Sequence, residues 1–193
     1  MNFFRIPSVL MIVACLSSCA DNPRHLILAP ELNLPTVSKY NNKQAQLNVT
    51  DLRTARHVIQ VLHKGKPAKL MTSEQTLSET IKEVLVMEFE NQGLSLKQLT
   101  NNQTAGNKVE IIIDEALINV NQATMSYDAK SNISLRIQVT NTQQTLTKTF
   151  NSRNDRSGPL TPDVAVLERD FNQQLTDALI NILTSDEVIQ FIK

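Results

Sequence analysis

The segment Asn132-Ile133-Ser134-Leu135-Arg136-Ile137-Gln138-Val139-Thr140 alternates between polar and apolar side chains. Successive side chains of a β-strand point to opposite faces of a sheet. This period of two therefore predicts a strand with one face on a core and the other in water. We expect the rest of the fold to be arranged around this strand.

The sequence on either side predicts two more strands of an antiparallel meander. Upstream, apolar residues lie at odd positions from Val109 to Ile113 and at even positions at Ile118 and Val120. A β-bulge at residues 114–116 accounts for this change of buried face. Downstream, residues 141–144 are expected to turn the chain into a third strand, which ends near residue 154.

The first half of the chain predicts a short strand and a hairpin. Leu47 and Val49 alternate with polar residues in a strand that ends at Asp51-Leu52-Arg53. Residues 58–62 and 68–71 are expected to pair across a turn at Lys64-Gly65-Lys66-Pro67.

Two helices are expected, each with one apolar face. The first covers residues 74–92, with Thr76 and Glu79 at the spacing of a capping box. The second begins at Thr161-Pro162-Asp163, where proline and an acidic residue favour a helix start. A short helix is expected at the C-terminal end. These elements combine economically as a two-layer α+β sandwich, in which two long helices pack on one face of a mainly antiparallel sheet.

The N-terminal sequence is typical of a bacterial lipoprotein signal. Arg5 precedes an 11-residue apolar run, residues 6–16, and Leu16-Ser17-Ser18-Cys19 places small residues directly before a cysteine. This pattern predicts cleavage between Ser18 and Cys19, a diacylglycerol thioether on Cys19 and acylation of its freed amine. A membrane span needs about 20 apolar residues, so the run is too short for one. An ordinary secretion signal is the remaining alternative.

These features predict three regions and a destination. Residues 1–18 are expected to be the signal peptide, residues 19–45 the lipidated N-terminus and tether, and residues 46–193 a single α+β periplasmic domain. An aspartate directly after the lipidated cysteine favours retention in the inner membrane. Ala20 stands there instead, so we expect the outer membrane, with the periplasmic face of the inner membrane as the alternative.

Charge and cysteine content exclude several classes of function. Removal of residues 1–18 takes away one charged side chain, Arg5, and leaves 18 basic and 19 acidic side chains. This balance provides no electrostatic footprint for nucleic acid. Cys15 lies in the signal and Cys19 carries the lipid, so the folded body has no cysteine for an internal disulfide or thiol catalysis.

Several features occur together in a recognisable order. The lipobox is followed by the segment Ile27-Leu28-Ala29-Pro30-Glu31-Leu32-Asn33-Leu34-Pro35, by Asp51-Leu52-Arg53, by two helices and by a closing Phe191-Ile192-Lys193. In this order they resemble the YajG-like family of bacterial envelope lipoproteins. The resemblance implies an envelope lipoprotein without an assigned activity. More distantly, the layout is similar to accessory lipoproteins of envelope transport systems.

Asp51 and Arg53 are the candidate site residues of the folded body. Because they are two positions apart, they lie on one face of a strand, where they can pair with each other or Arg53 can contact an anion. A structural role at the strand end is favoured, because aspartate commonly closes turns. Contact with a partner protein is the alternative.

Other polar residues give no convincing site, and no metal or cofactor is expected. His57 and His63 are six residues apart and would share a face of one unbroken strand. No third metal ligand is apparent, so two surface histidines are the favoured interpretation. Glu110, Asp114 and Glu115 could form a carboxylate pair, but Glu110 and Asp114 lie opposite the apolar face, where solvated side chains are expected.

We therefore expect a non-enzymatic envelope lipoprotein that binds or scaffolds a protein partner and is held at the membrane by the lipid on Cys19. The alternative is a lipid- or ligand-handling accessory of an envelope transport system. An open pocket of leucine, isoleucine and phenylalanine would favour that alternative, and a filled core with a polar surface would favour the first hypothesis. A hydrolase is disfavoured, because no nucleophile with a base and no glycine-rich phosphate loop is recognisable.

Overall fold

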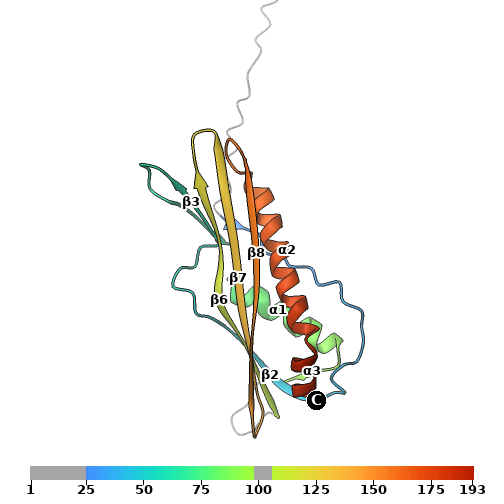
Figure 1. The fold of residues 1–193 in the computed structure, drawn as a ribbon. Helices are drawn as coiled ribbons and strands as arrows, with labels where there is room; N and C mark the ends of the chain where they lie inside the picture. The colour runs from blue at the N-terminus through green and yellow to red at the C-terminus, as the bar shows by residue number, and fades with distance from the viewer. Residues whose placement is uncertain (1–24, 98–105) are drawn as a thin grey trace, which may run out of the picture.

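The computed structural model describes residues 25–97 and 106–193, in which eight strands form one sheet and three helices lie on one side of it (Figure 1). The strands are β1 (His25–Leu26), β2 (Gln44–Asp51), β3 (Ile59–His63), β4 (Lys69–Ser73), β5 (Ser95–Leu96), β6 (Asn107–Gln122), β7 (Ser126–Thr140) and β8 (Thr145–Pro159). The helices are α1 (Leu77–Asn91), α2 (Val164–Leu183) and α3 (Asp186–Ile192).

The alternating segment 132–140 forms the C-terminal part of β7. Its four apolar side chains are at most 1% exposed: Ile133, Leu135, Ile137 and Val139. β7 pairs antiparallel with β6 on one side and with β8 on the other. The predicted meander is thus confirmed, and so is the bulge, because the β6–β7 register shifts between Ile113 and Glu115.

The prediction of a mainly antiparallel sandwich with two long helices is wrong. The sheet is mixed and curls like half a barrel, and its three helices have 15, 20 and 7 residues. Hydrogen-bonded neighbours follow the order β1-β4-β3-β6-β2-β5, in which β3 and β2 share one edge of β6. The other edge of β6 pairs with β7, and β7 pairs with β8. Both β2 and β3 pair with β6 in parallel, one after the other along the same edge.

The physical reason is that residues 52–94 form a crossover. A parallel pair needs a long connection, and the β3–β4 hairpin with α1 supplies it between β2 and β6. Sequence alternation shows which face of a strand is buried, but it carries no information about the direction of a neighbour from a distant part of the chain.

The helix starts follow from their capping residues. The Thr76 side chain accepts a hydrogen bond from the backbone N–H of Glu79, and the Glu79 side chain accepts one from the Thr76 N–H, which confirms the predicted capping box. Asp163 caps α2 by accepting a hydrogen bond from the Ala165 N–H at 2.9 Å. None of the helices within residues 25–97 and 106–193 combines the length and the hydropathy that a membrane span requires.

The core lies between the sheet and the helices. α1 packs on β2 and β5, while α2 packs on β8 and β7. Each helix contributes one row of buried side chains: Leu77, Ile81, Leu85 and Phe89 from α1, and Leu167, Phe171, Leu175, Leu179 and Ile182 from α2. The apolar faces that the sequence predicts for both helices are the faces that are buried.

The segment after β1 is fixed against α2. The backbone N–H of Ile27 donates to the Glu168 carboxylate at 3.0 Å, and the N–H of Ala29 donates to the Asn172 side-chain oxygen at 3.0 Å. Leu28, between them, is buried. Residues 27–29 are therefore docked onto α2.

Candidate functional site

Asp51 and Arg53 form a buried ion pair at the end of β2. Nε and Nη2 of Arg53 donate hydrogen bonds to the two carboxylate oxygens of Asp51, at 3.0 and 2.9 Å. The exposed fractions of the side chains are 3% for Asp51 and 7% for Arg53. Arg56, whose side chain is 66% exposed, lies 2.9 Å from the same carboxylate.

Arg53 also ties the β2–β3 loop to the bulge of β6. Its Nη1 donates to the backbone oxygen of Ala116 at 2.8 Å and to that of His57 at 3.4 Å. Burial acts to raise the pKa of Asp51, but the hydrogen bonds and charge of Arg53, together with the charge of Arg56, hold the pKa of this carboxyl below its ordinary value. The ion pair is therefore charged at neutral pH and holds the loop in place.

The residues next to this buried ion pair are exposed to solvent. Leu52 is 59% exposed, and a shallow cavity of about 190 Å³ lies between the β2–β3 loop and the β6 bulge. A partner that approached this loop would meet Leu52 and Arg56 first, because Asp51 and Arg53 are turned inward. Direct contact between a partner and the ion pair stays a prediction.

The histidines do not come together. His57 lies before β3, so the unbroken strand that would align it with His63 is absent there. Nε2 of His57 lies 3.0 Å from the side-chain oxygen of Gln60. Within residues 25–97 and 106–193, no group of three or more histidine, cysteine, aspartate and glutamate side chains is arranged to hold a metal ion.

The acidic residues of β6 are engaged with other side chains. Glu110 accepts a hydrogen bond from a threonine of β2 at 3.1 Å. Asp114 pairs with Arg136 at 2.7 Å, and Asn132 donates to Glu115 at 3.2 Å. These contacts between strands fit the solvated face that the sequence indicates.

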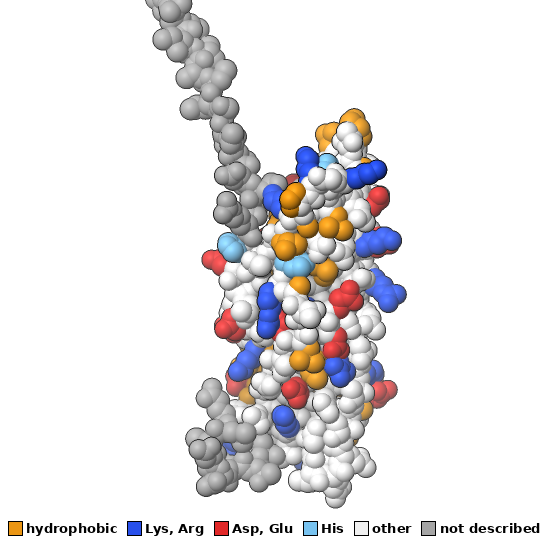
Figure 2. All heavy atoms as spheres, turned by 90° about the vertical axis from the view of Figure 1, so that its left-hand side faces the viewer, with side chains coloured by type: hydrophobic (Ala, Val, Ile, Leu, Met, Phe, Trp, Pro, Cys, Tyr) orange, Lys and Arg blue, Asp and Glu red, His pale blue; other side chains and the backbone are white. Residues whose placement is uncertain are grey.

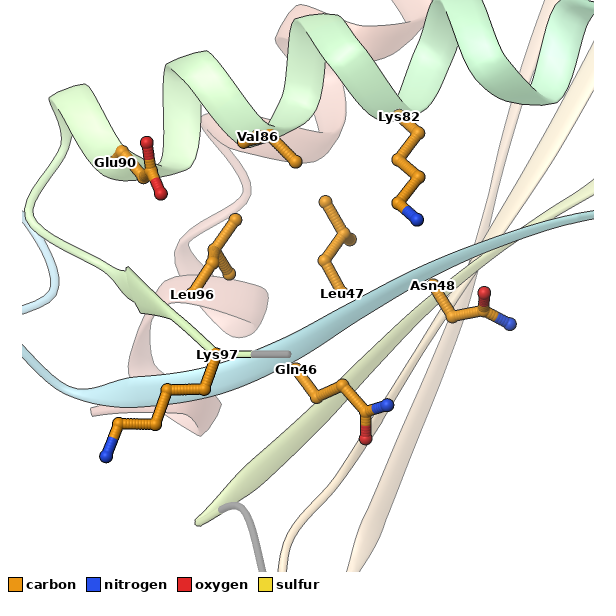
Figure 3. A pocket seen from close by; sticks show the side chains of 8 residues that line it. All are labelled: Gln46, Leu47, Asn48, Lys82, Val86, Glu90, Leu96 and Lys97. Atoms are coloured by element: carbon orange, nitrogen blue, oxygen red, sulfur yellow. The ribbon is translucent and has the colours of Figure 1, made fainter. Parts of the chain in front are cut away.

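An open groove between α1 and β2 is a candidate ligand site that no sequence pattern indicates (Figure 3). Its volume is about 380 Å³. Val86 of α1 points toward Leu47 of β2 and Leu96 of β5, and Lys82 points from α1 toward β2. The four-residue spacing of Lys82, Val86 and Glu90 places them in one row on the helix. Nothing in the sequence shows that this row faces β2.

The outer edge of β8 is a candidate site for a protein segment. Two backbone hydrogen bonds at the ends of the β7–β8 ladder show which residues of β8 face β7. The Leu160 N–H donates to the Met125 oxygen, and the Asn141 N–H donates to the Gln144 oxygen. Even-numbered residues of β8 therefore bond to β7, and the odd-numbered residues 145–157 direct their backbone N–H and C=O groups outward. No strand in the part of the chain that the structure describes pairs with this edge.

The sequence of β8 agrees with an unpaired edge. Pro159 is odd-numbered, so its backbone nitrogen points away from β7 and its missing N–H interrupts no bond to that strand. Sequence alternation indicates the strand, but it cannot distinguish a central strand from an edge strand.

The predicted cleavage and lipidation residues, Ser18 and Cys19, lie outside the described residues.

Comparison with known protein families gives a match along most of the chain. Residues 30–193 match the model of a family described as uncharacterized lipoprotein. The predicted lipoprotein class is thereby confirmed, whereas the narrower YajG-like assignment stays a prediction. No curated protein is detectably similar to this chain in sequence.

Two solved structures share the fold at low sequence identity, and a third is similar at a lower TM-score. A protein of the DUF330 family from Xanthomonas campestris is 15% identical, with a TM-score of 0.56 over 81% of this chain and 91% of that one. A second, uncharacterized protein is 10% identical, with a TM-score of 0.50 over 83% of this chain and 97% of that one. Rare lipoprotein B from Shewanella oneidensis is 11% identical, with a TM-score of 0.39 over 69% of this chain and 98% of that one.

Proposed function

Because this chain belongs to the family described as uncharacterized lipoprotein, we propose that it is a lipid-anchored, non-enzymatic protein of the bacterial envelope whose folded body binds a protein partner. Family membership supports the envelope location. Cys19 is the residue proposed to carry the lipid, and the outer membrane is the proposed destination. The non-enzymatic part of the proposal rests on the sequence, in which no nucleophile with its base is recognisable.

The observation that carries the protein-binding role is the outer edge of β8. A free strand edge presents backbone donors and acceptors to which an extended segment of another protein can add as a further strand. On β8 these groups belong to the odd-numbered residues, whose side chains are also exposed from Thr145 to Arg153. On the other face, Leu146 and Phe150 pack against the core. The strand is therefore held firmly while its edge stays accessible.

A proline substitution tests this role. Thr149→Pro removes one outward N–H and leaves the β7 ladder intact, so we expect partner binding to fall by about tenfold with little change in the melting temperature. Lys148→Pro, one residue earlier, removes a bond to β7 and should lower the melting temperature instead.

Binding is measured in the native envelope with a photocrosslinking residue at Asn151 on β8. The matched control carries the photocrosslinking residue in place of Glu83 on α1. The proposal requires a crosslinked protein that appears with the Asn151 probe alone and is lost in the Thr149→Pro variant. A crosslink of equal yield in that variant would exclude the β8 edge as the binding surface.

The groove between α1 and β2 favours a second candidate, the handling of a small ligand. Its volume lies in the range of ligand pockets, and Leu47, Val86 and Leu96 give it an apolar floor. Val86→Glu would place a charge on this floor. If the protein carries an amphiphile from the envelope, native mass spectrometry should detect it on the wild type and not on this variant.

A further inference from the structure

One end of the sheet carries two turns and the end of β8. In the β3–β6 register His63 pairs with Gln122, and in the β7–β8 register Ser126 pairs with Pro159. The β3–β4 turn, the β6–β7 turn and Leu160 therefore lie at the same end of the sheet. We name this the apolar end and define it as residues 62–70, 122–126 and 159–160.

The apolar end is rich in exposed apolar side chains. Met125 is 70% exposed, Leu160 59%, Leu70 53% and Leu62 39%, and these are four of the eight large apolar side chains that are exposed among the described residues. Figure 2 displays the side of the molecule that lies on the left in Figure 1. Hydrophobic side chains gather on its upper half, among lysine and arginine side chains. Such a group on one end of a body marks a contact surface.

Leu160 is exposed and also conformationally strained. Its φ is +58°, in the left-handed region that a leucine rarely adopts. The Leu160 N–H donates to the Met125 oxygen at 2.9 Å, and the Gln122 side chain donates to the Leu160 oxygen at 2.7 Å. These bonds hold Leu160 beside Met125. Folding does not explain a leucine here, because glycine would relieve the strain and the side chain buries little surface.

The hairpin beside this pair is basic. Residues 59–73 contain Lys64, Lys66 and Lys69 and no acidic residue. Apolar side chains next to lysines are the combination that binds an anionic lipid surface, because the lysines attract the headgroups while the apolar groups enter the acyl boundary.

β1 runs away from this end of the sheet, so its first residue, His25, lies on the side of the apolar end. β1 pairs in parallel with β4, so a step back from Leu26 to His25 moves from Ser73 to Thr72, toward Lys69 and the β3–β4 turn. Cys19 precedes His25 by six residues. A chain of that length spans at most about 21 Å, so a lipid on Cys19 keeps His25 within about that distance of the bilayer.

We propose that the apolar end inserts Met125 and Leu160 into the lipid surface to which Cys19 is attached, with Lys64 and Lys66 on the anionic headgroups. This inference rests on the proposed lipidation of Cys19. It gives the body a fixed orientation at the membrane, instead of free rotation on a tether.

The chain contains no tryptophan, so one introduced tryptophan reports on its surroundings alone. Met125→Trp places it at the apolar end, and Met87→Trp on α1, where Met87 is 55% exposed, is the matched control. Both full-length lipidated proteins are reconstituted in phosphatidylethanolamine–phosphatidylglycerol vesicles with brominated or plain acyl chains. We expect the brominated chains to quench the fluorescence of M125W about twofold and to leave that of M87W unchanged.

Two further variants test the parts of the contact. Lys64→Glu with Lys66→Glu should weaken the quenching of M125W in these vesicles, whereas Lys82→Glu on α1 should not. Leu160→Gly should raise the melting temperature, because it relieves strain, and should still weaken the quenching. Quenching that is insensitive to both changes would overturn the proposed contact.

The outcomes separate this inference from the proposed function. Protein that floats with the vesicles but shows equal quenching for M125W and M87W overturns the inference and leaves the lipid anchor intact. Protein that does not float overturns both. A blue-shifted M125W emission without vesicles, together with a doubled mass, would assign the apolar end to a second copy of the chain and overturn the lipid contact.

Discussion

Asp51 and Arg53 are charged side chains that are buried together, and each compensates the cost of burying the other. Asp51→Asn would leave the Arg53 guanidinium buried without its counter-charge, which typically costs about 3–5 kcal/mol. We expect the free energy of unfolding at pH 7 to fall by an amount of this order, as measured by urea denaturation. Asp114→Asn, which removes an acid from a partly exposed pair with Arg136, is the control and should change the free energy of unfolding less.

The same pair should make stability depend on pH. The folded state holds the pKa of Asp51 below its ordinary value, so the unfolded state binds a proton first as the pH falls. The stabilising contribution is therefore complete above the unfolded pKa of about 4 and is lost as the pH drops through the folded pKa. The difference between wild type and Asp51→Asn should shrink toward low pH, and a difference that stays constant down to pH ~2 would contradict this origin.

Tyr40 is also a buried polar residue, but no hydrogen bond offsets the cost of burying its hydroxyl. Its side chain is 0% exposed, its hydroxyl has no hydrogen-bond partner among the described residues, and burial raises its pKa. The ring packs edge-on against Phe89, with centroids 5.8 Å apart, and phenylalanine would keep this contact. Tyr40→Phe should leave the melting temperature unchanged or raise it, because a buried unpaired hydroxyl costs about 1–3 kcal/mol. A clear decrease would reveal a partner such as a bound water.

The sequence could predict only part of this candidate site. The two-residue spacing of Asp51 and Arg53 placed them on one face and permitted an ion pair. Their burial depends on Ala116, which accepts the third hydrogen bond from across the sheet. That contact exists only because β2 and β3 both run along β6, a long-range arrangement that spacing along the chain does not encode.

At the scale of elements, β7 provides the clearest test of the buried face. Ile137→Asp places an unpaired charge at a side chain that is 0% exposed, and should lower the free energy of unfolding by about 3 kcal/mol or more. Thr140→Asp lies on the opposite face of the same strand, opposite Lys108. Equal losses in urea denaturation for the two variants would show that the register of β7 is wrong.

Buried faces and some boundaries were predictable because they depend on local physics. The end of β8 was not, because the strand continues to Pro159 instead of ending near residue 154. The parity change before Ile118 placed the bulge, and Thr76 with Glu79 placed the start of α1. Strand neighbours were not predictable in the same way. β2 could have paired with the hairpin that follows it, and the sequence contains no feature that excludes this, so the parallel β2–β6 pairing decides the architecture without a local signal.

At the scale of the whole molecule, the mixed sheet separates the possible contact surfaces. β1 lies at one extreme of the strand order, and β8 lies beyond β7 on the other side of β6. The proposed membrane contact lies at the apolar end, where both hairpins turn, whereas the accessible edge of β8 extends along the strand away from it. A partner added to β8 would therefore leave the apolar end free for the bilayer.

The destination of the protein can be tested through the residue after the cysteine. Ala20 provides no inner-membrane retention signal, so the wild type should fractionate with outer-membrane markers on a density gradient. Ala20→Asp should move a large share of the protein to the inner-membrane fractions. Cys19→Ser, which lacks the thiol that would be lipidated, should remain an uncleaved precursor that a labelled fatty acid does not tag.

The three results exclude different parts of the proposal. Wild-type protein found with inner-membrane markers would exclude the outer-membrane destination without affecting lipidation, and Asp21 would then be the residue to replace next. Fatty-acid labelling of Cys19→Ser would exclude Cys19 as the anchor.

Salt extraction tests the anchor separately. If acylated, Cys19 carries three chains, and each methylene that enters the bilayer contributes about 0.8 kcal/mol to binding. High salt, which screens charge, should therefore not release the protein from the membrane. Release by salt would indicate that the lysines of the apolar end hold the protein there without a lipid.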